Sequence, residues 1–149
     1  MVQSSDLGNG TVVDTNIFIS VEQGRLEPEA VISTIEAPLF IAAITVSELL
    51  AGVHLAKSKE TRIRRSAFVE GIIGSVPMLE FNKQVARVYA EIFALFIRPR
   101  AKATTDVHDL QIAATAIANG YCVKTQNIAD FRNIPGVALQ PIEINKTLV

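Results

Sequence analysis

Four acidic residues occupy places in the sequence where carboxylates can do chemistry. Asp14 directly follows two apolar β-branched residues, Glu48 lies in "TVSELL", Asp109 in "DVHDLQIA" and Asp130 in "TQNIADF". Carboxylates that are brought together repel one another and raise each other's pKa, so such a cluster persists when a cation neutralises it. Carboxylates without Cys or His partners suit a hard, oxygen-binding ion, which predicts Mg²⁺, with Mn²⁺ as a substitute.

Two of these acids also have a structural interpretation at the start of a helix. Asp14 can cap a helix that begins near Asn16, since Asp is among the preferred N-cap residues. Thr45 and Glu48 have the spacing of a capping box, in which the Glu side chain reaches back to the backbone amide of the cap residue. For these two positions the sequence leaves capping and chemistry open.

The other two acids differ in how easily a structural role explains them. Asp130, close to Asn127, can be an ordinary turn residue in a loop. Asp106 is the better N-cap for the helix that contains Asp109, so we assign capping to Asp106. Asp109 then gains only the modest dipole stabilisation of an acid in a first turn, about 0.3–1 kcal/mol. Of the four acids, Asp109 is therefore the one for which a purely structural role explains least.

The elements that must position these acids can be read from the hydrophobic pattern. Strands are predicted at "TVVD" (11–14), "LFIAAI" (39–44), "PMLEF" (77–81), "YCVKT" (121–125) and "VALQPI" (137–142). Helical spacing fills about 46–57, about 59–74, 83–97 and about 107–119, and Gly120 can close the last helix in the left-handed conformation. Apolar strands alternating with helices predict an α/β fold with a mainly parallel sheet covered on both faces. Ligands bind beyond the carboxyl ends of such strands, where the four acids are expected to meet.

Length and composition predict one globular domain. The chain has 149 residues, 49% of them hydrophobic, and we expect a flexible lead-in over 1–10 followed by a domain over 11–149. The longest apolar runs, 39–44 and 92–97, are far shorter than the roughly 18 residues of a membrane span. The N-terminal segment lacks the pattern of a secretory signal, which predicts a cytoplasmic location. The single cysteine, Cys122, is expected to be a small buried hydrophobic residue.

The charge is nearly balanced, so its distribution carries more information than its sum. There are 14 Lys and Arg residues against 15 Asp and Glu, with basic clusters at "RIRR" (62–65) and "RPRAK" (98–102). The ordinary interpretation of such clusters is a solvated helix face or loop. The two histidines exclude a three-histidine zinc site. We expect His54 to be a partly packed helix residue. His108 adjoins Asp109, where a histidine can contact substrate, but we expect it to be a solvated residue in a first helical turn.

Four segments, in their order along the chain, carry a resemblance to a known family. They are "VVDTNIF" (12–18), "TVSELLAG" (45–52), "DLQIAATAIANG" (109–120) and "VKTQNIADFRNIPGV" (123–137). Together these motifs resemble the PIN-domain ribonucleases of the VapC type. The likeness covers nearly the whole chain after the lead-in and is weakest between about 55 and 105.

This resemblance implies a three-layer α/β/α sandwich, a Mg²⁺-dependent endoribonuclease acting on RNA, and the role of toxin in a bacterial toxin–antitoxin pair. It further implies a homodimer and a cognate antitoxin protein that covers hydrophobic grooves. Asp14, Glu48 and Asp109 match the three main acids of the family's site. The fourth family position is Asn127 here, and Asp130 is the nearest carboxylate, which favours one bound ion over two.

The implied reaction is hydrolysis of a phosphodiester by a water that the metal activates. Either Glu48 or Asp130 would take the water's proton. Residues that would orient the acids or the metal's waters are Thr15, Asn16 and Thr125. The segment containing Arg98 and Arg100 would hold the negatively charged substrate.

Two other functions remain open at this stage. A phospho-acceptor receiver domain also gathers acids at strand ends and uses a late lysine, for which Lys124 stands. That class needs a second acid beside Asp14 and a central acceptor Asp, and the strand "PMLEF" ends without one. The other alternative is a member of the same fold that binds RNA without cutting it.

Overall fold

The architecture rests on a five-stranded parallel sheet. The computed structural model describes residues 9–33, 37–97 and 105–142, so Arg98, Arg100 and most of the expected lead-in lie outside the described residues. The strands are β1 (Thr11–Val13), β2 (Leu39–Ala42), β3 (Met78–Leu79), β4 (Cys122–Thr125) and β5 (Leu139–Pro141). Each lies inside the run that predicted it, and each is shorter than that run.

The strand order places the N-terminal strand at the centre of the sheet. The order is β3-β2-β1-β4-β5, and every paired neighbour runs parallel. From β1 the chain moves outward through β2 to β3 and then crosses to β4 on the other side of β1. The strand order therefore reverses beside β1. In parallel sheets such a switch point, at the carboxyl ends of the strands, is where ligands bind.

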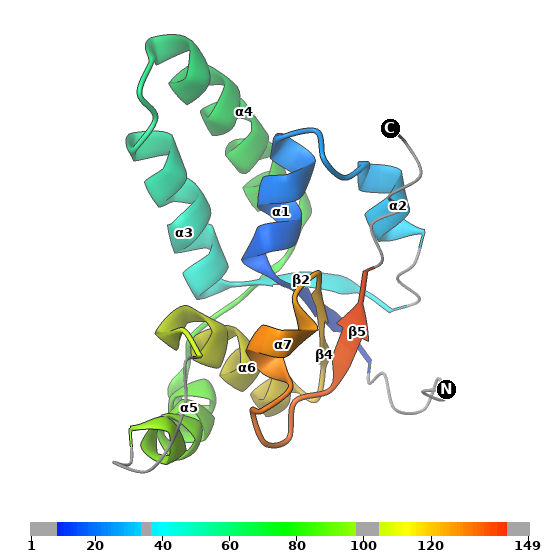
Figure 1. Ribbon diagram of the computed structural model, residues 1–149, viewed down its shortest axis with the longest axis vertical. Helices are drawn as coiled ribbons and strands as arrows, with labels where there is room; N and C mark the ends of the chain where they lie inside the picture. Colours follow the sequence, from blue (N-terminus) through cyan, green and yellow to red (C-terminus); the bar gives the residue numbers. More distant parts are fainter. Residues whose placement is uncertain (1–8, 34–36, 98–104, 143–149) are drawn as a thin grey trace.

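Helices cover both faces of this sheet, as Figure 1 shows. One layer contains α1 (Thr15–Glu22), α2 (Pro28–Ile32), α3 (Ala43–His54) and α4 (Lys59–Ser75). The other contains α5 (Lys83–Phe96), α6 (Val107–Asn119) and α7 (Ile128–Phe131). The predicted three-layer α/β/α sandwich is confirmed. Within the described ranges no helix is both long enough and apolar enough to cross a bilayer.

Alternation along the central strands divides the core into two parts. Successive strand side chains point to opposite faces of a sheet. Val12 and Ala42 accordingly pack with α5 and α6, whereas their neighbours Val13 and Ile41 pack with α1, α3 and α4. The predicted apolar stripe of α5 faces the first cluster through Val85, Val88, Tyr89, Ile92, Phe93 and Phe96. Cys122 is buried, as predicted.

Helix ends follow the local signals where such signals exist. Ser58 and Asn82 cap α4 and α5 by accepting hydrogen bonds from backbone amides three residues later. Asp106 caps α6 by accepting from the His108 amide at 2.7 Å, as predicted. Gly120 ends α6 with φ of 71°, in the left-handed region that favours glycine.

The start of α3 departs from the prediction. The run 39–44 was expected to be strand throughout, but α3 already begins at Ala43, with Ala42 at its N-cap position and no side-chain cap. Thr45 is thus the third residue of the helix, and the capping box with Glu48 is wrong. The short helices α2 and α7 were not anticipated, and Asp130 lies in α7 rather than in a loop. His54 is exposed at the end of α3 rather than partly packed.

Candidate active site

Asp14 lies where the central strand ends and α1 begins. Its side chain is 1% exposed, and although it occupies the N-cap position it makes no cap hydrogen bond. Instead Asp14 Oδ2 accepts a hydrogen bond of 2.8 Å from the Thr125 hydroxyl at the end of β4. The capping interpretation of Asp14 is therefore wrong. A residue of the neighbouring strand holds this carboxylate. Helix capping therefore does not explain why a buried acid occupies this position.

Glu48 reaches the same edge of the sheet from the second turn of α3. The Thr15 hydroxyl lies 2.9 Å from both Glu48 Oε1 and the Thr45 hydroxyl, so these two acceptors share its single proton. The other oxygen, Glu48 Oε2, is 3.3 Å from Nδ1 of His108 on α6. His108 is half-exposed, but it contacts a site residue, which its prediction as a solvated side chain did not include.

Asp130 is positioned by the segment that follows β4. The Asn127 side-chain amide donates to Asp130 Oδ2 at 2.6 Å. The Asn127 backbone amide donates to the Thr125 hydroxyl oxygen at 2.9 Å, and that hydroxyl in turn donates to Asp14. A chain of hydrogen bonds thus links two of the acids. In this structure Asn127 orients the Asp130 carboxylate.

All four predicted acids line one pocket of about 220 Å³ at the carboxyl edge of the sheet. Its lining consists of Asp14, Thr15, Asn16, Glu48, Asp106, His108, Asp109 and Asp130. Thr125 and Asn127 stand behind it and touch the acids by hydrogen bonds. Asp106 and His108 were not predicted as site residues. Their position beside Asp109, at the start of the same helix, is the sequence feature that could have identified them.

The acids of the pocket are close enough for their charges to raise one another's pKa. Burial, and after it the charges of Asp14 and Asp130, raise the pKa of Asp109 to about 7. Burial also raises the pKa of Asp14 to about 6, against the opposing effect of the Thr125 hydrogen bond. The acids therefore repel one another when ionised. A bound cation would relieve that repulsion.

The donors fit a hard divalent ion by their chemistry, since carboxylate and amide oxygens predominate. In the described part of the chain, however, no group of three or more His, Cys, Asp or Glu residues is arranged to hold a metal ion. In this structure Thr125, Thr15 and Asn127 each donate to one carboxylate oxygen, of Asp14, Glu48 and Asp130 respectively. The acids surround the pocket without closing on a common point.

The receiver alternative finds no support at this site. Lys124, the lysine that it would use, is 3% exposed in β4 and does not line the acidic pocket. Strand β3 ends at Leu79 and is followed by Glu80, not by the acceptor Asp that this class needs.

The sequence profile of the PIN domain matches residues 11–136. This chain belongs to the PIN-domain family. The match spans β1 to the loop before β5 and includes all four acids of the pocket. The resemblance predicted from the sequence motifs is thereby confirmed.

Relatives of this PIN domain carry ribonuclease names. It is 36% identical over 126 residues to Ribonuclease VapC of Rickettsia bellii, and the alignment covers 85% of this chain and 91% of that relative. It is 34% identical over 128 residues to Ribonuclease VapC1 of Rickettsia felis, with 86% and 92% covered. A crystal structure of DNA-bound VapBC from Salmonella typhimurium matches with a TM-score of 0.77 and 26% identity, over 90% of this chain and 98% of that chain.

Proposed function

We propose that this PIN domain cleaves RNA at the acidic pocket with the help of Mg²⁺ or Mn²⁺. The family and its VapC relatives make the chain an endoribonuclease toxin of a toxin–antitoxin system. The dependence on metal and the assignment of residues are our additions. One observation supports both the metal and the residues: four acids, from the residue before α1 and from α3, α6 and α7, line a single pocket at the switch point of the sheet.

Asp14, Glu48, Asp109 and Asp130 would hold the ion. A divalent cation in such a pocket offsets the charge that grows on the phosphoryl group and favours ionisation of the attacking water. The hydrogen bond from Thr125 fixes the orientation of the Asp14 carboxylate, and the hydroxyl of Thr15 does the same for Glu48. Asn16 is exposed at the rim of the pocket, where it can contact substrate.

One of the acids would also take the proton from the attacking water. Glu48 and Asp130 are our two candidates, and each is oriented by a hydrogen bond from a neutral partner, Thr15 or Asn127. His108 beside Glu48 can stabilise the charge of that carboxylate. The segment containing Arg98 and Arg100 would hold the negatively charged substrate. These two arginines lie outside the described residues.

The toxin would act as a homodimer and be neutralised by a protein antitoxin. Large apolar side chains are exposed on or beside α5 and at the start of α6: Met78, Phe81, Leu95, Ile97 and Val107. A contiguous apolar patch is typical of a protein interface, and we propose that these side chains form one. An apolar groove of about 390 Å³ between α1, α2 and α4 offers the antitoxin a second surface. Light scattering should give a dimer mass, and replacing Ile97 with Asp should give a monomer.

Sequencing of RNA ends tests the activity. Total RNA is incubated with the protein in Mg²⁺ or in chelator, and in parallel with Asp109→Asn. We expect new ends at defined sites with the wild type in Mg²⁺, and none in either control. If the protein binds RNA in Mg²⁺ but creates no ends, the proposal is wrong and the chain is the RNA-binding module without activity.

A further inference from the structure

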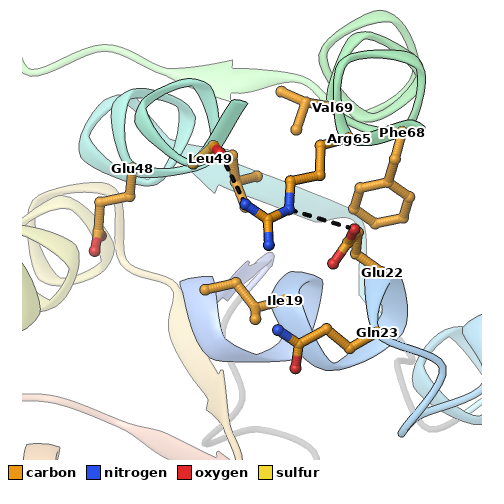
Figure 2. Close-up of a pocket in the computed structure, with 9 residues that line it drawn as sticks. Ile19, Glu22, Gln23, Glu48, Leu49, Arg65, Phe68 and Val69 are labelled. Carbon is orange, nitrogen blue, oxygen red and sulfur yellow. Dashed lines mark hydrogen bonds and ion pairs between the residues drawn. The ribbon is translucent and has the colours of Figure 1, made fainter. Parts of the chain in front are cut away.

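A second pocket lies on the other side of Glu48. It has a volume of about 200 Å³ between α1, α3 and α4, and its lining consists of Ile19, Glu22, Gln23, Glu48, Leu49, Gly52, Arg65, Phe68 and Val69. We call it the side pocket (Figure 2). Glu48 lines both this pocket and the acidic one. A group bound in the side pocket is therefore a near neighbour of a group bound at the acids.

Glu22 gives the side pocket an unused hydrogen-bond acceptor. The side chain of Glu22 is 11% exposed, and within the described part of the chain no hydrogen bond reaches its Oε1 atom. The Nε atoms of Arg64 and Arg65 lie 3.8 and 3.7 Å from Oε1, which is ion-pair distance but too long for a hydrogen bond. A buried acceptor without a donor carries a free-energy cost. An N–H group of a ligand would remove that cost.

Arg65 supplies the donor beside this acceptor. Its Nη1 donates to the Gly52 carbonyl oxygen at 3.0 Å, so the guanidinium is held between α3 and α1. Figure 2 shows the Arg65 side chain extending from α4 to the Glu22 carboxylate, with Glu48 turned away from both. Arg62 and Arg64 are exposed on the same helix. The "RIRR" cluster thus provides one fixed cation in the pocket and two exposed cations elsewhere on the same helix.

The walls and the size of the side pocket suit a flat ring. Ile19, Leu49 and Phe68 provide apolar surface, and a nucleobase stacks favourably on an aromatic side chain. The volume lies below the roughly 300–1,000 Å³ of pockets for drug-sized ligands, so one base fits better than a larger molecule. The three arginines of α4 favour a polyanion, which argues for RNA over an acidic or neutral protein segment.

Among the bases, guanine matches the polar groups most completely. Its Watson–Crick edge has two adjacent N–H donors beside the O6 acceptor. A carboxylate accepts both donors, and an arginine donates to O6, which is among the commonest base contacts of arginine. Adenine offers only one amino group to the carboxylate on that edge.

We propose that the side pocket binds a guanine base next to the phosphodiester that is cut, with Glu22 accepting from its N1–H and N2–H groups and Arg65 donating to O6. The proposal rests on the ribonuclease function of the acidic pocket. It makes Glu22 and Arg65 determinants of cleavage specificity, outside the group of acids that hold the metal.

Short RNA substrates test this proposal. Each carries the cleaved sequence found for the wild type, with guanine, inosine or adenine placed in turn at the positions flanking the cut. Inosine lacks only the N2 amino group, so it removes one hydrogen bond without changing the protein. At one flanking position we expect kcat/KM to fall about tenfold from guanine to inosine, and further to adenine.

Glu22→Gln should reduce the ratio of guanine to inosine cleavage to near one, while Glu70→Gln, an exposed acid on α4, should leave it unchanged. Equal cleavage of all substrates by the wild type overturns the proposal, as does a guanine preference that survives in Glu22→Gln. A Glu22→Gln variant that alters only the binding of a partner protein overturns it as well. Failure of the wild type to cut any RNA in Mg²⁺ refutes the ribonuclease function instead, which separates the two failures.

Discussion

Asp14→Asn separates the charge of the pocket from the structure that surrounds it. The amide has the shape of the carboxylate and can still accept the hydrogen bond from Thr125 through its oxygen. It carries no charge, so it neither repels Asp109 nor contributes to holding a cation. We therefore expect the variant to be more stable than the wild type in chelator and to lose RNA cleavage by orders of magnitude.

The size of the stability gain follows from the pKa of Asp14, which rises from 3.8 to about 6 on folding. Below pH 3.8 the carboxyl group is protonated in both states, and the shift costs nothing. The cost grows as the pH rises from 3.8 to about 6 and is complete above that. At about 1.4 kcal/mol per pKa unit, it reaches roughly 3 kcal/mol at pH 8 and falls below about 1 kcal/mol at pH 4.

Thermal melting in chelator at pH 8 and at pH 4 measures this difference. A gain of roughly 3 kcal/mol corresponds to about 6–12 °C for a chain of this size. Asp106→Asn is the matched control, because Asn caps a helix about as well as Asp and this position is exposed. It should change the free energy of unfolding by less than about 0.5 kcal/mol. If Asp14→Asn melts at or below the wild-type temperature at pH 8, the carboxylate is not under the strain that we infer.

Three further predictions concern the metal, the pH and a helix end. Millimolar Mn²⁺ should raise the melting temperature of the wild type, because bound ion adds about 2.7 kcal/mol to the free energy of unfolding at a hundred times the dissociation constant. Asp109→Asn should reduce this shift, and an unchanged melting temperature of the wild type in Mn²⁺ argues against the site. Because the pKa values of Asp14 and Asp109 are both raised, their contribution makes the metal-free protein less stable at pH 7 than at pH 5, which urea denaturation at the two pH values measures. Gly120→Ala should lower the free energy of unfolding by roughly 1–2 kcal/mol, since alanine is strained at positive φ. Gly71→Ala inside α4 should instead raise it by about 0.5–1 kcal/mol; similar effects of the two changes would contradict the role of Gly120.

Local signals predicted the parts of the fold that local interactions create. The helix α6 was predicted with its bounds because Asp106 and Gly120 mark its two ends. The beginning of α3 was missed because "LFIAAI" is a continuous apolar run and Ala42 provides no cap. Helices as short as α2 and α7 contain too few residues to show a helical period.

The acidic site was predictable as a set but not as a geometry. The rule for parallel sheets brought the acids to one edge, and the structure places all four there. The partners that hold them arise from packing of distant segments, as with Thr15 and Glu48, which are 33 residues apart. The same holds for Glu22 in the side pocket. Nothing in its local sequence marks it, since its surroundings come from α3 and α4.

The central position of β1 has a consequence for how the toxin folds during its synthesis on the ribosome. β1 precedes every other strand of the sheet along the chain, and its partner β4 and the acid Asp130 follow only after β2 and β3. Asp14 and Thr125, which are joined by a hydrogen bond, are 111 residues apart. A growing chain therefore has no assembled acidic pocket until β4 has emerged, because pairing across such a separation must wait for the second strand. A fragment that ends before β4 lacks Thr125 and Asp130, so it cannot assemble the pocket at which the toxin cuts RNA.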